Sequence, residues 1–150
     1  MKAVIQRVKY ASVKVDGEII GTIDNGFLVF LGVSETDTKE DAEILARKTA
    51  SLRIFQDDEG KMNKSLLDLS YGALVISQFT LLADTKKGNR PSFIHAAKPE
   101  LAIPLYELFV DELKKNGVTE VAHGEFGADM KVELLNDGPV TIIYDTEQWK

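Results

Sequence analysis

The stretch SQFTLLAD, residues 77–84, places polar side chains where a strand pattern alone does not require them. Ser77, Gln78 and Thr80 follow directly on the apolar run ALVI. At the carboxyl end of a buried strand, such donors and acceptors commonly face a ligand. With a base beside it, Thr80 would be a nucleophile for covalent catalysis. Threonine is also an ordinary β-branched strand residue.

A second stretch, NDGPVT at residues 136–141, separates the apolar runs MKVELL and VTIIYD. Asp137-Gly138 is typical of a two-residue hairpin turn. Pro139 then lacks the N–H that a returning strand donates, although proline is tolerated at the first residue of a strand. The residues therefore predict a hairpin turn and leave the purpose of the proline open.

Other catalytic motifs are missing from the chain. It contains no cysteine and no GxSxG, Walker, HExxH or GxGxxG pattern, so we expect no thiolate nucleophile, no protein metal cage and no cofactor. The two histidines are His95 and His123. His95 could serve as a general base, but without an evident Ser or Asp partner it is more typical of a loop or core histidine.

The composition is that of a globular protein, with 150 residues, 44% hydrophobic and 28% charged. We expect a single domain over residues 1–150. The opening MKAVIQRVKY alternates apolar and polar residues, unlike a secretion signal. No apolar run approaches the ~20 residues that span a bilayer. The sequence therefore predicts a soluble cytoplasmic protein with no membrane partner. The net charge of −6 argues against general nucleic-acid binding, but not against recognition by a local basic patch.

The hydrophobic pattern predicts mostly strands, with two main helices at about 37–52 and 99–116. Residues 27–33 and 73–79 are apolar on both faces, as in central, doubly covered strands. The last part of the chain predicts three further strands. The expected fold is α/β with α+β character: a mostly antiparallel, mixed, barrel-like sheet of seven or more strands flanked by the two helices. Residues 83–93 form a loop with the densest positive cluster, Lys86, Lys87 and Arg90.

Taken together, SQFTLLAD, TKKGNRPSF, FGADMKVELLNDGPVT and MKAVIQRV resemble the D-aminoacyl-tRNA deacylase family, from Met1 to about Asp145. The motifs SQFT and NxGPxT are signatures of that family, and both are intact. The resemblance implies hydrolysis of the ester that joins a D-amino acid to the 3′-terminal adenosine of tRNA. It also implies removal of mischarged glycine, no cofactor, and a homodimer with active sites at the subunit interface.

The resemblance also assigns roles to residues. It implies that one subunit lines the pocket with Ser77, Gln78, Phe79 and Thr80. The other subunit would insert Gly138-Pro139, joined by a cis bond, to exclude L side chains. Rigid backbone that clashes with the wrong enantiomer can reject it while accepting many D side chains and glycine.

Arg7 would support Gly138-Pro139, and Met130 would line the adenosine pocket. On the residues alone, Arg7 could equally be an exposed strand arginine and Met130 a core residue. Phe79 would either stack near the adenine or pack inward. The loop residues Lys86, Lys87 and Arg90 would steer the acceptor end of the tRNA.

Two mechanisms follow for the ester. In the preferred one, backbone N–H groups at Phe79 and Thr80 form an oxyanion hole, and water attacks with help from the ribose 2′-OH of the tRNA. In the other, Thr80 is a covalent nucleophile. Two different functions compete with hydrolysis: a non-catalytic dimeric module that binds RNA ends or a nucleotide, and a structural oligomer without a ligand.

Overall fold

The computed structural model describes residues 1–150. Its main sheet has six strands in the order β2-β1-β3-β6-β7, with β8 paired to the other edge of β1. A separate two-stranded sheet joins β4 to β5. The strands are β1 Lys2–Val15, β2 Glu18–Ile23, β3 Gly26–Gly32, β4 Phe55–Gln56, β5 Met62–Lys64, β6 Gly72–Ser77, β7 Val121–His123 and β8 Lys131–Asp145.

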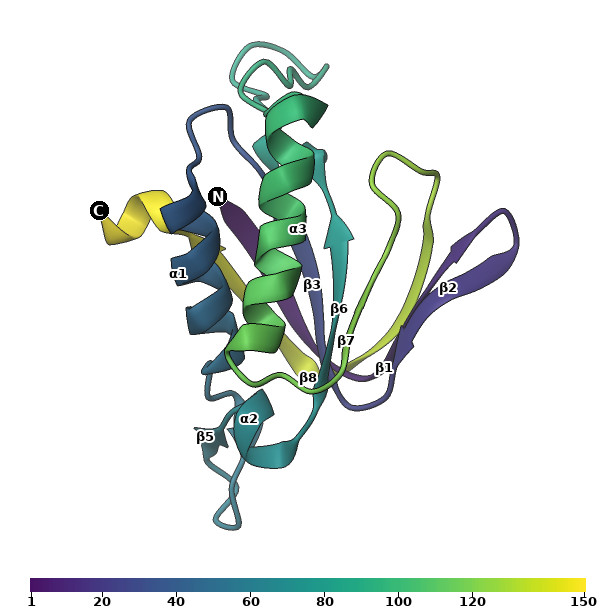
Figure 1. The fold of residues 1–150 in the computed structure, drawn as a ribbon, viewed down its shortest axis with the longest axis vertical. Helices are drawn as coiled ribbons and strands as arrows, with labels where there is room; N and C mark the ends of the chain where they lie inside the picture. Colours follow the sequence, from purple (N-terminus) through teal and green to yellow (C-terminus); the bar gives the residue numbers. More distant parts are fainter.

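The helices are α1 Lys39–Ala50, α2 Leu66–Leu69 and α3 Pro99–Lys115, with short 3₁₀ turns η1 Phe79–Leu82 and η2 Thr146–Trp149. In Figure 1, α1 and α3 lie side by side over one face of the sheet, while β2 and the adjoining parts of β1 and β8 curl away from it. The predicted mixed sheet flanked by two main helices is confirmed. The main sheet has fewer strands than expected, because two predicted strands form the single strand β8. No helix combines the length and the apolar character needed to cross a membrane.

Strand β1 organises the sheet because it pairs on both edges. Its first half pairs with β3 and its second half with β2, while β8 runs antiparallel along most of its other edge. Strands β3 and β6 pair in parallel, from Gly26 opposite Gly72 to Leu31 opposite Ser77. The carboxyl ends of these two central strands therefore meet at the same edge of the sheet.

Apolar residues cover both faces of the central strands. A cluster of 24 buried residues fills the space between the sheet and α1 and α3. A second cluster of 7 packs within the curl of β1 and β2 against the other face, and includes Leu28, Leu74 and Ile76. This double burial explains why β3 and β6 read as continuous apolar runs.

The segment NDGPVT does not form the predicted hairpin turn. Residues on both sides of it pair antiparallel with β1, Asn136 with Val8 and Thr141 with Gln6, so the chain does not reverse. The register shifts between Gln6 and Val8, which marks an irregularity in the ladder. A bulge accommodates Pro139, because the residues there need not donate to the partner strand.

Candidate active site

The SQFT segment turns over the end of the two central strands. Strand β6 ends at Ser77, and the Gln78 N–H still donates to the carbonyl of Leu31 in β3 at 2.8 Å. The chain then tightens into η1, where Leu81 donates to the carbonyl of Gln78 and Ala83 to that of Thr80. The N–H groups of Phe79 and Thr80 open this turn, where the first donors of a helix have no intrahelical partner.

This turn rests directly on the backbone of Gly32, the last residue of β3. A Cβ atom at Gly32 would lie 2.7 Å from Cδ2 of Leu82, 3.0 Å from Cβ of Leu81 and 3.1 Å from the carbonyl oxygen of Gln78. A side chain at this position would therefore press on Leu82 and crowd the backbone of the turn that carries Thr80. The absence of a Cβ at Gly32 lets η1 pack closely against the end of β3.

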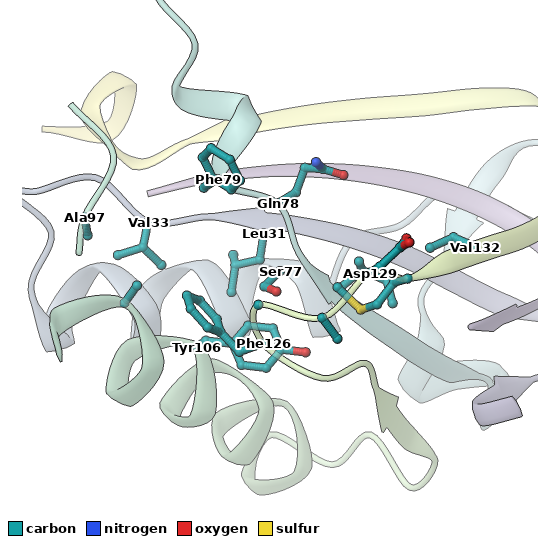
Figure 2. A pocket seen from close by; sticks show the side chains of 15 residues that line it. Leu31, Val33, Ser77, Gln78, Phe79, Ala97, Tyr106, Phe126, Asp129 and Val132 are labelled. Carbon is teal, nitrogen blue, oxygen red and sulfur yellow. The ribbon is translucent and has the colours of Figure 1, made fainter. Parts of the chain in front are cut away.

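A cavity of about 290 Å³ opens beside the SQFT turn. Figure 2 shows Leu31 and Val33 from β3 and the segment after it on one side, and Tyr106 and Phe126 below Ser77. The Tyr106 hydroxyl donates to the carbonyl of Val75 at 2.8 Å, and burial raises the pKa of Tyr106. Its phenol is therefore a neutral, satisfied part of the wall, and the cavity is apolar except near Ser77, Gln78 and Asp129.

Thr80 and Gln78 are joined by a side-chain hydrogen bond. Nε2 of Gln78 donates to Oγ1 of Thr80 at 2.5 Å. No histidine or carboxylate hydrogen-bonds to Thr80, and an amide cannot accept the proton that a nucleophilic hydroxyl must lose. The arrangement fixes the hydroxyl in place without activating it.

Phe79 and Met130 both line the cavity. Met130 also packs against the second hydrophobic cluster, so the wall and core interpretations of this residue are compatible. Phe79 does not pack inward: it is 56% exposed, and its ring meets that of Phe93 edge-to-face at 4.9 Å.

Arg7 is a buried residue, only 6% exposed, and not an exposed strand arginine. Its NH1 group donates to the carbonyl of Ile54 at 2.7 Å, and its Nε donates to the carbonyl of Asp137 at 2.9 Å. The Asp137 carboxylate lies 3.5 Å from the same Nε. Arg7 thus ties the NDGPVT segment to the chain that follows α1.

Gly138 and Pro139 are exposed, and the peptide bond between them is cis. The Asn136 side chain, to which no sequence pattern assigns a role, donates to the carbonyls of both Arg7 and Val140, at 3.0 and 3.1 Å. Its position at the start of NxGPxT was the available signal. Together with Arg7, Asn136 holds the exposed pair on a rigid base.

The structure does not bring Gly138-Pro139 and Ser77–Thr80 of one chain together. Asn136 pairs with Val8, which pairs with Gly26, which pairs with Gly72 at the start of β6. Ser77 is at the other end of β6, five residues along, or about 16 Å at ~3.3 Å per residue. The two motifs lie at opposite ends of the central sheet.

The basic residues Lys86, Lys87 and Arg90 lie in an exposed loop, closed at its base by two hydrogen bonds of 2.8 Å between Asp84 and Ser92. None of their side chains forms an ion pair. In Figure 1 this loop stands above the amino-terminal end of α3, at the edge of the sheet where β6 ends. It is therefore on the same side of the molecule as the cavity.

The remaining titratable clusters have partners of their own. Nδ1 of His95 lies 3.2 Å from the Glu35 carboxylate, and Nδ1 of His123 lies 2.7 Å from the carbonyl of Gly124. The carboxylates of Asp37, Asp41 and Glu147 gather within 4.8 Å of one another. The Met1 ammonium contacts Asp37 at 2.6 Å, and Lys150 contacts Asp41 and Glu147 at 3.3 and 2.8 Å, so each of the three carboxylates is already paired with a cation of the chain itself.

The family model described as D-Tyr-tRNA(Tyr) deacylase matches residues 4–145, which include the SQFT turn, the cavity and the NDGPVT segment. The chain belongs to this family. Curated relatives match this chain over nearly their whole length. The D-aminoacyl-tRNA deacylase of Fusobacterium nucleatum is 60% identical over 147 residues, covering 98% of this chain and 97% of the relative. The D-aminoacyl-tRNA deacylase of Thermus aquaticus is 55% identical over 148 residues, covering 99% of this chain and 97% of the relative.

Solved structures share the deacylase fold described above. One, named c-Myc DNA Unwinding Element Binding Protein, superposes with a TM-score of 0.91 at 45% identity and covers 97% of this chain and 98% of its own. Another, described as a probable eukaryotic D-amino acid tRNA deacylase, gives a TM-score of 0.82 at 16% identity, covering 95% and 97%. At that identity the second structure supports the fold alone.

Proposed function

We propose that this protein is a D-aminoacyl-tRNA deacylase. It hydrolyses the ester between a D-amino acid, or mischarged glycine, and the 3′-terminal adenosine of tRNA, within a single domain formed by residues 1–150. The observation that carries the proposal is the SQFT turn at the mouth of an apolar cavity, in a chain that is 60% identical to a protein named for this activity. The cavity accepts the adenosine, with Met130 in its wall.

The chemistry needs little activation because an aminoacyl ester is already reactive. The N–H groups of Phe79 and Thr80 stabilise the oxyanion, and water attacks with help from the 2′-OH of the tRNA. The hydrogen bond from Gln78 to the Thr80 hydroxyl supports a positioning role for Thr80. A covalent mechanism would require a base in that place.

Chiral selection is proposed to come from a second copy of the chain in a homodimer. Since Gly138-Pro139 and Ser77–Thr80 lie at opposite ends of one sheet, a twofold-related copy that meets the site must supply the Gly138-Pro139 pair. There the exposed pair excludes an L side chain by contact while it accepts hydrogen or a D side chain. Arg7 and Asn136 support this role by holding the pair rigidly.

A non-catalytic nucleic-acid module is the competing function, and the name of the structure with a TM-score of 0.91 includes DNA binding. The net charge of −6 and the isoelectric point of about 5.0 disfavour broad duplex binding. The deciding experiment measures release of tyrosine from D-tyrosyl-tRNA and L-tyrosyl-tRNA. We expect release of D-tyrosine only. Release of neither would refute the enzyme, and equal release of both would refute the role of Gly138-Pro139.

The shared site can be tested separately by mixing two impaired variants. We expect Thr80→Ala chains and Pro139→Ala chains, refolded together, to form mixed dimers in which one site is intact and the other carries both changes. About a quarter of all sites then regain wild-type behaviour, by the statistics of a twofold dimer. If mixing restores nothing although mixed dimers form, each chain builds its site alone.

A further inference from the structure

An exposed aromatic pair stands at the mouth of the cavity. Phe79 lines the cavity, yet it is 56% exposed, and the Phe93 ring meets it at 4.9 Å with an interplanar angle of 70°. Ile94, the next residue, is 69% exposed. Apolar side chains that contact one another and still face water are typical of a binding surface.

Free positive charge lies beside this pair. The Asp84–Ser92 bridge closes the basic loop immediately before Phe93, so the loop and the ring share one short segment. Lys86, Lys87 and Arg90 are exposed and form no ion pairs. An aromatic face next to unpaired cations suits single-stranded nucleic acid, whose bases stack on rings while its phosphates meet the cations.

The size of the cavity leaves the rest of such a strand outside. A volume of about 290 Å³ is at the small end for ligand pockets. It accommodates one terminal nucleoside, so the nucleotide before it must lie at the mouth, where Phe79 and Phe93 are found. The strand then continues toward the basic loop.

We propose that Phe79, held in place by Phe93, binds the base of the nucleotide that precedes the terminal adenosine, and that the loop at residues 84–92 binds the adjoining phosphates. The inference rests on the proposed function for the placement of the adenosine in the cavity. Phe79 supplies the open face for stacking. Phe93 is a positioning residue, because its edge contact holds the Phe79 ring in place.

The test is a double-mutant cycle between protein and RNA. The probe is a hairpin RNA with an unpaired 3′ strand whose terminal adenosine carries D-tyrosine through a stable amide. A second probe lacks only the base of the preceding nucleotide. We expect wild type to bind the abasic probe about tenfold more weakly, and Phe93→Leu to bind the full probe about tenfold more weakly. The abasic probe should bind both proteins equally, because each change removes the same contact.

The proposal is overturned if the two losses in affinity multiply, so that Phe93→Leu weakens binding of the abasic probe as much as binding of the full probe. It is also overturned if the effect of Phe93→Leu depends on the terminal adenine and not on the preceding base. Phe93→Tyr keeps the ring and should restore the coupling, which separates loss of stacking from loss of folding. Hydrolysis of the D-tyrosyl ester of adenosine is measured in parallel. If wild type does not hydrolyse this ester, the deacylase function is refuted. The binding measurements would still test whether Phe79 and Phe93 hold the base of the preceding nucleotide.

Discussion

Asn136 and Arg7 each hold the other's segment: the Asn136 amide donates to the Arg7 carbonyl at 3.0 Å, and the Arg7 guanidinium donates to the carbonyl of Asp137 at 2.9 Å. The amide of Asn136 also reaches Val140 across the Gly138-Pro139 pair. Both flanks of the exposed pair are thereby fixed to β1. A selector that works by steric contact depends on such rigidity, because a mobile loop would yield to the wrong substrate.

Asn136→Ala should therefore weaken chiral selection. We expect the ratio of kcat/KM for D-tyrosyl-tRNA over L-tyrosyl-tRNA to fall about tenfold, an effect of the size of one or two lost hydrogen bonds. Asn116→Ala is the matched control, since it removes a similar amide bond, to the carbonyl of Glu112 at the end of α3. A ratio that falls equally in both variants would show that Asn136 acts through general stability.

Arg7→Met should destabilise the fold. It leaves the buried carbonyl of Ile54 and the carbonyl of Asp137 without their donor, which we expect to lower the free energy of unfolding by about 2–3 kcal/mol. Lys9→Met is the control, because Lys9 also approaches the Asp137 carboxylate, at 3.7 Å, but its side chain is exposed to solvent. Lys9→Met should alter the free energy of unfolding by no more than ~0.5 kcal/mol. Urea denaturation measures both, and equal costs would contradict the role of Arg7.

Thr80→Ala should slow deacylation without abolishing it. If the hydroxyl only positions substrate or water, single-turnover rates should fall about 10- to 100-fold, the loss of one transition-state contact. Gln78→Ala should have a similar effect, and the double variant little more, because Gln78 holds the same hydroxyl. Loss of the entire acceleration, with a trapped acyl-enzyme in related variants, would establish Thr80 as the nucleophile.

Neutralising the basic loop should change how binding responds to salt. Replacement of Lys86, Lys87 and Arg90 by Gln should reduce the slope of log Kd against log salt by about 2, at ~0.7 per contact with single-stranded phosphate. The control replaces the exposed Lys61, Lys114 and Lys115. They lie next to β5 and in the last turn of α3, elements that end away from the basic loop in Figure 1. An unchanged slope in the first variant would leave that loop as solvated surface.

Asp41 makes stability depend on acid pH. Burial raises its pKa, but the Thr38 N–H, the Thr146 and Lys150 side chains and the charged amino terminus more than offset this, and together lower the pKa from 3.8 to about 2. Because the folded pKa lies below the unfolded one, the stabilisation is complete above about pH 4 and lost as the pH falls toward 2. It amounts to about 2 kcal/mol.

The corresponding measurement compares wild type with Asp41→Asn. The free energy of unfolding of wild type should fall by about 2 kcal/mol more than that of the variant between pH 5 and pH 2. Glu43→Gln, a change on the same helix at an exposed position, is the control. Identical pH profiles for wild type and Asp41→Asn would place the acid-sensitive groups elsewhere.

Local patterns predicted most of the fold. The helical period identified both main helices, and the apolar runs identified β3 and β6. The short helix α2 was missed, although Ser65 and Asp68 form a capping box that is visible in the sequence. The same residue types occur in hairpin turns and at irregularities within a strand, so the local sequence of NDGPVT predicts a turn. Only the pairing of both its flanks with β1, more than a hundred residues earlier in the chain, distinguishes them.

The candidate site is harder to predict from local sequence patterns than the fold is. The position of Ser77–Thr80 at the end of a buried strand followed from the apolar run. The burial of Arg7 did not, because its partner Ile54 is 47 residues away and belongs to no pattern that includes Arg7. Nor could spacing indicate that Phe93 braces Phe79, since the contact depends on how the basic loop closes.

Gly32 limits how this site could be redesigned. The turn that carries Thr80 rests on the bare backbone of Gly32, so an added methyl group would press on Leu82 and crowd Leu81 and the carbonyl of Gln78. A larger or differently shaped cavity is better engineered elsewhere, from wall residues such as Val33, Ala97 and Ala102, which line the cavity without supporting the turn. Substrate range and catalytic geometry are thus separately adjustable parts of the same small cavity.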